Sequence, residues 1–270
     1  MPTKSKKWKS HGRPKNLITQ NRKQTKGATC HTVGLSLTPG GNRCAESRYC
    51  LPTCLAFQAG MNRFRNVQEA KKRKTDWLYQ DRAGFLARLR ADIAREKRKA
   101  KRLGLPLAVR LNVTSDLDWV GLAPDLFDDN PEVIFYDYTK ILDRAIAAAQ
   151  GKMPKNYRLH FSHDGHTDQR LIEAYRAGVS VVVVVKGWRK DQSVSDLRLP
   201  NGLHYIDGDE HDERFRDPAN SVVLLREKGG KTGLSISPEV ARELFARLRT
   251  PARAARSTGH KTRSAHRARR

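Results

Sequence analysis

Cysteine is scarce in this sequence and confined to one stretch. The four cysteines of the 270-residue chain, Cys30, Cys44, Cys50 and Cys54, fall within twenty-five positions. The basic start has no apolar core behind it, so we expect no secretory signal and a reducing cytoplasm, where two disulfides are disfavoured. There is also no run of eighteen apolar residues, which excludes a membrane-spanning helix and a membrane partner.

Acidic residues are absent from both ends of the chain. Residues 1–26 contain nine Lys or Arg and residues 249–270 contain eight, so the ends carry 17 of the formal net charge of +25. This composition predicts two disordered basic arms. Such arms attach to phosphate backbones, so nucleic acid is one candidate partner, and arms that only solubilise are the alternative.

Two basic runs lie outside the arms, in stretches with helical spacing. They are KKRK at 71–74 and REKRKAKR at 95–102. Each is typical of a solvated helix face. Together with the arms they could form one positive surface for nucleic acid, which a steep salt dependence of binding would support.

Residues 27–248 alternate between strand and helix patterns, which predicts a single α/β domain with a parallel sheet. The expected strands are 32–37, 107–112, 133–136, 157–161, 180–185, 203–206 and 221–225, and the expected helices are 66–79, 81–103, 124–127, 138–150, 167–177 and 238–248. The polar residues that follow the strands favour a partial barrel of about six strands, in which strand ends converge on one mouth.

Candidate site residues stand at these strand ends. They are Asn112, Ser115 and Asp116 after the second strand, Asp137, Tyr138 and Lys140 after the third, and Ser162, His163 and Asp164 after the fourth. Each residue alone is explained as well by capping the helix that follows. As a set they predict a site.

The cysteine spacing predicts a bound metal or iron–sulfur cluster. Cys44, Cys50 and Cys54 read Cys-x5-Cys-x3-Cys, and thiolates are the soft ligands that zinc and iron–sulfur sites require. Thiols that merely pack, or that have a redox role, are the remaining alternative.

Five segments together resemble a phage and plasmid family called mycobacteriophage gene product eighty-eight. They are TKGATC, LSLTPGGNRCAESRYCLPTC, RLNVTSDLDW, FYDYTK and HFSHDG, and the resemblance covers roughly residues 25–185. The resemblance implies a protein that a phage or plasmid encodes and that is located in the host cytoplasm. It implies no activity.

A more distant likeness is to radical S-adenosylmethionine enzymes, which carry three cysteines in the loop after the first barrel strand. Their usual spacing is Cys-x3-Cys-x2-Cys, from which this chain departs. The likeness implies a [4Fe–4S] cluster on Cys44, Cys50 and Cys54, with Cys30 outside it, and S-adenosylmethionine on the open iron. Implied cofactor-binding residues are Asn112, Ser115, Asp137 and Ser162, and implied catalytic residues are Asp116, Tyr138, Lys140, His163 and Asp164; the substrate is not implied.

Two rival functions stay open. If all four cysteines bind one zinc, the protein is a zinc-stapled, basic nucleic-acid-binding module, although the spacing is irregular for a zinc ribbon. A metal-dependent nuclease or hydrolase would use hard ligands instead. These are present at His163, Asp164, His166 and Asp168, and at Asp207, Asp209, His211 and Asp212.

Overall fold

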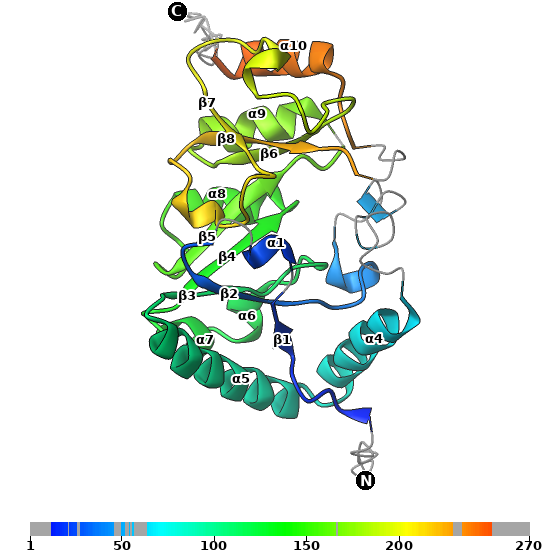
Figure 1. Cartoon of the computed structure of the whole chain (residues 1–270), viewed down its shortest axis with the longest axis vertical. Coiled ribbons are helices and arrows are strands. Elements are labelled where there is room, and N and C mark those ends of the chain that lie inside the picture. Colours follow the sequence, from blue (N-terminus) through cyan, green and yellow to red (C-terminus); the bar gives the residue numbers. More distant parts are fainter. Residues whose placement is uncertain are drawn as a thin grey trace, which may run out of the picture.

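The computed structural model describes residues 12–20, 22–25, 28–45, 50–51, 54, 56, 64–165, 167–228 and 234–249. They form an eight-stranded sheet in the order β1-β2-β3-β4-β5-β6-β8-β7 (Figure 1). The strands are β1 (Ile18–Thr19), β2 (His31–Leu35), β3 (Leu107–Arg110), β4 (Ile134–Thr139), β5 (Tyr157–Ser162), β6 (Val181–Val185), β7 (His204–Asp207) and β8 (Ser221–Arg226).

Every neighbouring pair in the sheet is parallel except β1 with β2. The predicted α/β class with a parallel sheet is therefore confirmed. No ladder joins β1 to β7 among the described strands, so the sheet is open. Because β2 to β8 run in one direction, their carboxyl ends share one edge, which we call the carboxyl edge.

Eight α-helices lie within the described residues, and all but α1 contribute apolar side chains to the cores beside this sheet. They are α1 (Arg22–Thr25), α4 (Arg65–Gln80), α5 (Arg82–Leu103), α6 (Trp119–Leu122), α7 (Asp125–Asp128), α8 (Leu142–Ala149), α9 (Asp168–Arg176) and α10 (Pro238–Arg249). One apolar core joins α4 to α7 with β2 to β5, and a second joins α8, α9 and α10 with β5, β6 and β8. Figure 1 shows α4 and α5 at one end of the molecule and α10 at the other.

Helix α5 shows why the sequence pattern was readable. Phe85, Leu89 and Ile93 recur every four residues and are all fully buried. Asp81 caps the helix by accepting a 2.9 Å hydrogen bond from the amide of Gly84. Gly104 ends it with a φ of 65°, in the left-handed region that favours glycine.

The basic arm expected over residues 1–26 is shorter in the structure. Ile18 and Thr19 pair with β2, and Leu17 and Ile18 are buried. Two apolar side chains among the cations are enough to dock this segment on α5, where the carboxylate of Asp92 accepts the Leu17 amide at 2.6 Å. Residues 1–11 and 250–270 lie outside the described residues.

A second correction concerns residues 138–141. A helix was expected from Tyr138, but β4 continues to Thr139 and α8 begins at Leu142. The alternation Tyr136–Asp137–Tyr138–Thr139 pairs residue by residue with β5, which overrides the helical propensity of the next residues. None of the described helices is long and apolar enough to cross a membrane.

Candidate functional site

The carboxyl edge brings three of the four cysteines together. Cys44 forms an isolated parallel bridge with Asp116, so the cysteine segment is joined to the loop that follows β3. The amide of Gly40 donates a hydrogen bond to the sulfur of Cys44 at 3.4 Å. Cys50 and Cys54 are hydrogen-bonded to each other, and both interact electrostatically with Cys44.

The environment divides these thiols into one acidic and two weakly acidic groups. The hydrogen bond with Cys54, helped by the nearby Lys140 ammonium and opposed by burial, lowers the pKa of Cys50 to about 6. The same bond with Cys50 raises the pKa of Cys54, and burial raises the pKa of Cys44. Within this pair, the thiolate is therefore favoured on Cys50 rather than on Cys54.

Cys30 lies away from this group. It precedes β2, whereas Cys44 follows it, and the five residues of this strand, four steps of about 3.3 Å, separate its two ends by roughly 13 Å. The Cys30 amide donates to the carboxylate of Glu213 at 2.8 Å, and burial beside that carboxylate raises the pKa of the thiol. The arrangement thus gives a group of three cysteines and one separate cysteine.

Lys140 is the cation at the centre of the carboxyl edge. Its ammonium donates to the hydroxyl of Ser162 at 3.1 Å and to the carbonyl of His163 at 2.6 Å. Burial lowers its pKa, opposed by the charges of Cys50 and of neighbouring carboxylates. Lys140 therefore contacts the Ser162 side chain and the His163 backbone, and its charge acts on Cys50 and Cys54.

Two predicted carboxylates are held by arginines. Asp116 accepts from Arg144 at 2.8 Å and from the hydroxyl of Thr139 at 3.2 Å, and burial raises its pKa. Asp164 is fully buried and pairs with Arg170 at 2.8 Å. Asp116 still reaches the cysteine group, because its charge acts on both Cys44 and Cys50.

Three other predicted residues form the support beneath the site. The Asn112 side-chain oxygen accepts from the hydroxyl of Ser115 at 2.9 Å and the indole of Trp119 at 3.2 Å. Asp137 accepts from the Asn112 amide at 2.7 Å and from the hydroxyl of Tyr157 at 3.0 Å. The polar atoms of these residues form hydrogen bonds within the protein. These bonds fix the turn after β3, and they leave few groups for a ligand.

Tyr138 belongs to a polar layer on the other face of the sheet. The guanidinium of Arg110 lies 4.5 Å from the centre of the Tyr138 ring. The carboxylate of Asp212 accepts hydrogen bonds from Arg110 at 3.4 Å and from the hydroxyl of Tyr136 at 3.1 Å. The Tyr138 hydroxyl and the His160 Nδ1 are buried and have no hydrogen-bond partner among the described residues. Burial, with two nearby arginines, lowers the pKa of His160 to about 3.

Arg110 and His160 were missed as site candidates, although the sequence holds a signal. Central strands of a parallel sheet are expected to be apolar on both faces. Instead β3, β4 and β5 place Arg110, Tyr136, Tyr138 and His160 on one face, with Tyr138 paired opposite His160. Polar residues at every second position of a buried strand therefore indicate that one face of the sheet borders a polar interior.

The hard-ligand candidates do not gather. The imidazole of His163 lies 3.6 Å from the carboxylate of Asp168, and His166 is outside the described residues. In the acidic loop, Asp207 is bidentate to Arg226 at 2.8 Å, and Asp209 pairs with Lys228 at 2.8 Å. These carboxylates neutralise neighbouring cations within the protein.

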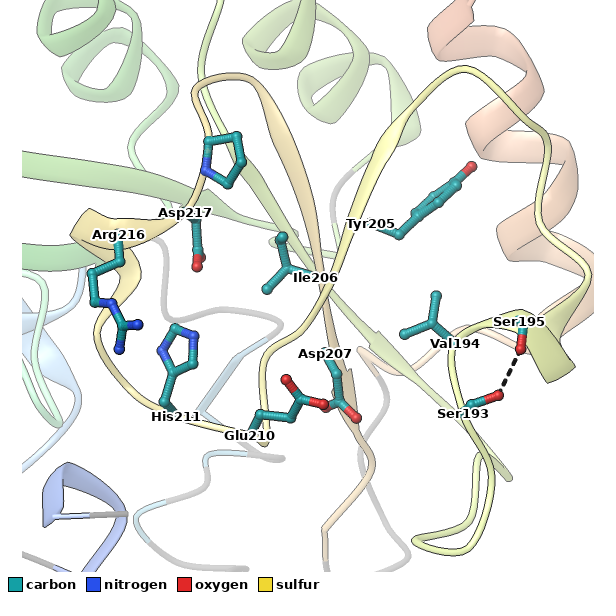
Figure 2. A pocket seen from close by; sticks show the side chains of 11 residues that line it. Ser193, Val194, Ser195, Tyr205, Ile206, Asp207, Glu210, His211, Arg216 and Asp217 are labelled. Atoms are coloured by element: carbon teal, nitrogen blue, oxygen red, sulfur yellow. Dashed lines mark hydrogen bonds between the residues drawn. The ribbon is translucent and has the colours of Figure 1, made fainter. Parts of the chain in front are cut away.

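A cavity of about 550 Å³ opens beside this loop. Figure 2 shows Tyr205, Ile206 and Asp207 of β7 lining it, with His211 and Arg216 on the facing loop. Its lining includes none of Cys44, Cys50 and Cys54. The cavity is therefore separate from the cysteine group.

Metal binding would need the cysteine side chains to turn toward a common centre. Within the part of the chain that the structure describes, no three His, Cys, Asp or Glu side chains stand close enough to hold an ion as placed. Cys44, Cys50 and Cys54 are nonetheless neighbours, with sulfur atoms that are soft ligands. They are the described residues best suited to a thiophilic metal.

Comparison with known protein families gives a match over residues 8–255 to the family described as Gene product 88. The chain belongs to the Gene product 88 family. The match extends well beyond the residues that suggested it, to the end of α10. No curated protein and no solved structure matches the chain, so the likeness to radical S-adenosylmethionine enzymes gains no support from these comparisons.

Proposed function

We propose that this Gene product 88 protein is an iron–sulfur enzyme of the radical S-adenosylmethionine type. The observation that carries the proposal is the separation of the cysteines: Cys44, Cys50 and Cys54 gather at the carboxyl edge while Cys30 stands at the far end of β2. Three thiolates leave one iron of a cubane cluster open for a further ligand.

The donor set fits such a cluster. The three thiols are half-buried, an N–H group already donates to the sulfur of Cys44, and Lys140 supplies a positive charge near Cys50. Hydrogen bonds and charge around the sulfurs are the means by which proteins tune these clusters. When bound, the cluster supplies the electron for reductive cleavage of S-adenosylmethionine.

The protein's own residues have distinct parts in this proposal. Lys140, held by Ser162 and the carbonyl of His163, is placed to bind the carboxylate of a ligand at the carboxyl edge. The carboxylate of Asp116 orients Lys140 by accepting a 2.8 Å hydrogen bond from its backbone amide. The polar interior face of the sheet that carries Arg110, Tyr138 and His160 would receive the substrate. The consecutive order of β2 to β6 supports a partial barrel around that interior.

The test is metal analysis of the full chain purified without oxygen. We expect about four irons and four sulfides per chain. The variants Cys44→Ser, Cys50→Ser and Cys54→Ser should each lose iron, and Cys30→Ser, the matched control, should retain it. Addition of a strong one-electron reductant and S-adenosylmethionine should then yield the cleaved adenosyl product.

Two outcomes would overturn the proposal. One zinc per chain with no iron would leave a zinc-stapled nucleic-acid-binding protein as the better account. Equal loss of metal from Cys30→Ser would show that all four cysteines bind together, contrary to their placement. The nuclease alternative has no specific support, because the acidic loop carboxylates are paired with arginine and lysine.

A further inference from the structure

A second cavity, of about 540 Å³, lies along helix α4 beside the cysteine segment. Its lining includes four cations, Arg43, Arg65, Lys71 and Lys72, and two carboxylates, Glu69 and Asp76. We call it the α4 groove. The net charge of this lining is +2. Each carboxylate forms an ion pair with a cation one helical turn before it, Glu69 with Arg65 at 2.8 Å and Asp76 with Lys72 at 2.6 Å.

Two exposed aromatic side chains stand at the ends of α4, on the helix face that carries part of the groove lining. Phe64 precedes the helix and is 62% exposed, and Tyr79 in its last turn is 45% exposed. Positions 64, 68, 72, 75 and 79 follow the three- and four-residue spacing of one helix face, and the three between the aromatics line the groove. This row carries one cation, Lys72, between the two aromatic rings, and Arg43, Arg65 and Lys71 line the groove beside it.

This surface adjoins the cysteine group. Lys71 interacts electrostatically with Cys54, and Arg43 interacts with Cys44. The guanidinium of Arg43 also lies 5.8 Å from the ring centre of Tyr79. A ligand lying along α4 would thus reach the carboxyl edge at Cys44 and Cys54. Figure 1 shows α4 next to the segment that follows β2.

We infer that the α4 groove binds single-stranded nucleic acid and presents it to the cysteine site. Cations that follow a backbone, with aromatic rings on which bases stack, form the general binding surface for single strands. A double helix keeps its bases stacked internally and could not use Phe64 or Tyr79. The role of the strand as substrate rests on the proposed function, whereas the binding itself does not.

Fluorescence anisotropy of the full chain tests the binding, with a labelled single strand of about twelve nucleotides. The double variant Arg65→Gln/Lys72→Gln should weaken binding and reduce the salt slope by about 1.4, that is 0.7 for each of two charges. Phe64→Ala should weaken binding roughly five- to a hundredfold. It should also abolish the fluorescence change of a stacked base analogue in the strand.

The control variant is Lys152→Gln/Lys155→Gln, which removes two exposed lysines from the connection between α8 and β5. It should bind as the wild type does. The inference is overturned if this control loses as much affinity as the groove variant, if the groove variants bind normally, or if a duplex of the same sequence binds as tightly. Iron content of the wild-type preparation separates the two proposals: iron without strand binding contradicts only the groove, and strand binding without iron contradicts only the cluster.

Discussion

Replacing Asp137 by asparagine should change how the stability of the protein depends on pH. This carboxyl is 1% exposed, and burial raises its pKa from 3.8 to about 7. The folded state therefore keeps a proton on Asp137 between pH 4 and 7, where the unfolded chain has released it. Because the folded state then binds more protons, the free energy of unfolding falls as pH rises through this range. Three pH units at about 1.4 kcal/mol each give an upper value of about 4 kcal/mol.

Asp137→Asn removes this titration with little change of shape. The amide oxygen can still accept from the Asn112 amide, and the amide nitrogen can donate to the hydroxyl oxygen of Tyr157. At pH 4 the wild-type carboxyl is protonated and neutral, so the variant loses no charge attraction and should be close to the wild type in stability. It should exceed the stability of the wild type at pH 7. Urea unfolding at half-unit steps from pH 4 to 7.5 measures the difference between the two proteins.

Asp81→Asn is the matched control, because hydrogen bonds at the start of α5 lower the pKa of Asp81. Its stabilising contribution is present above the unfolded pKa and is lost only as pH falls below about 4. The difference between wild type and this control should stay flat from pH 5 to 7.5. A flat difference for Asp137→Asn over the same range would refute the assignment of Asp137 as a buried, protonated support.

Two further substitutions test the packing around the site, with urea unfolding as the measurement in both. Gly34→Ala should cost about 1–3 kcal/mol, because the new methyl carbon would stand 2.5 Å from a methyl carbon of Val113 and 2.6 Å from the amide nitrogen of Gln24. A loss below about 0.5 kcal/mol would contradict this close approach. Asn112→Ala should cost roughly 2–4 kcal/mol, because it deletes the acceptor of three buried hydrogen bonds, and a loss under 1 kcal/mol would show that the turn after β3 does not depend on them.

Much of the fold was predictable because its elements carry strong local patterns. The continuous apolar run at 181–185 is β6, buried in the sheet, and the four-residue spacing of α5 gave its bounds almost residue for residue. Leu17 and Ile18 could not be assigned in this way. Two apolar residues among many cations have no periodicity. The contacts of the Leu17 backbone with Asp92 and Lys74, which help to hold it, come from residues more than fifty positions away.

The location of the candidate site was predictable, but which of its residues face a ligand and which support the fold was not. Strand direction alone places residues after β3, β4 and β5 at one edge, which is why Asp116, Lys140 and Ser162 meet. The sequence could not show which polar atoms are used internally. It also could not place Asp212, more than a hundred residues after Arg110, against that arginine. Contacts of this kind depend on the path of the whole 208–220 connection.

The support residues bear on the chemistry that the carboxyl edge can perform. A buried ammonium such as that of Lys140 keeps one position only if its neighbours have no freedom to move. Its amide is held by Asp116, its carbonyl accepts from Arg170 at 3.0 Å, and its ammonium bonds Ser162 and the His163 carbonyl. Capping and catalysis are therefore not competing explanations for these strand ends. The residues that cap and brace each loop are what hold one cation in a fixed position beside three thiols, and a ligand arriving there meets a preorganised charge.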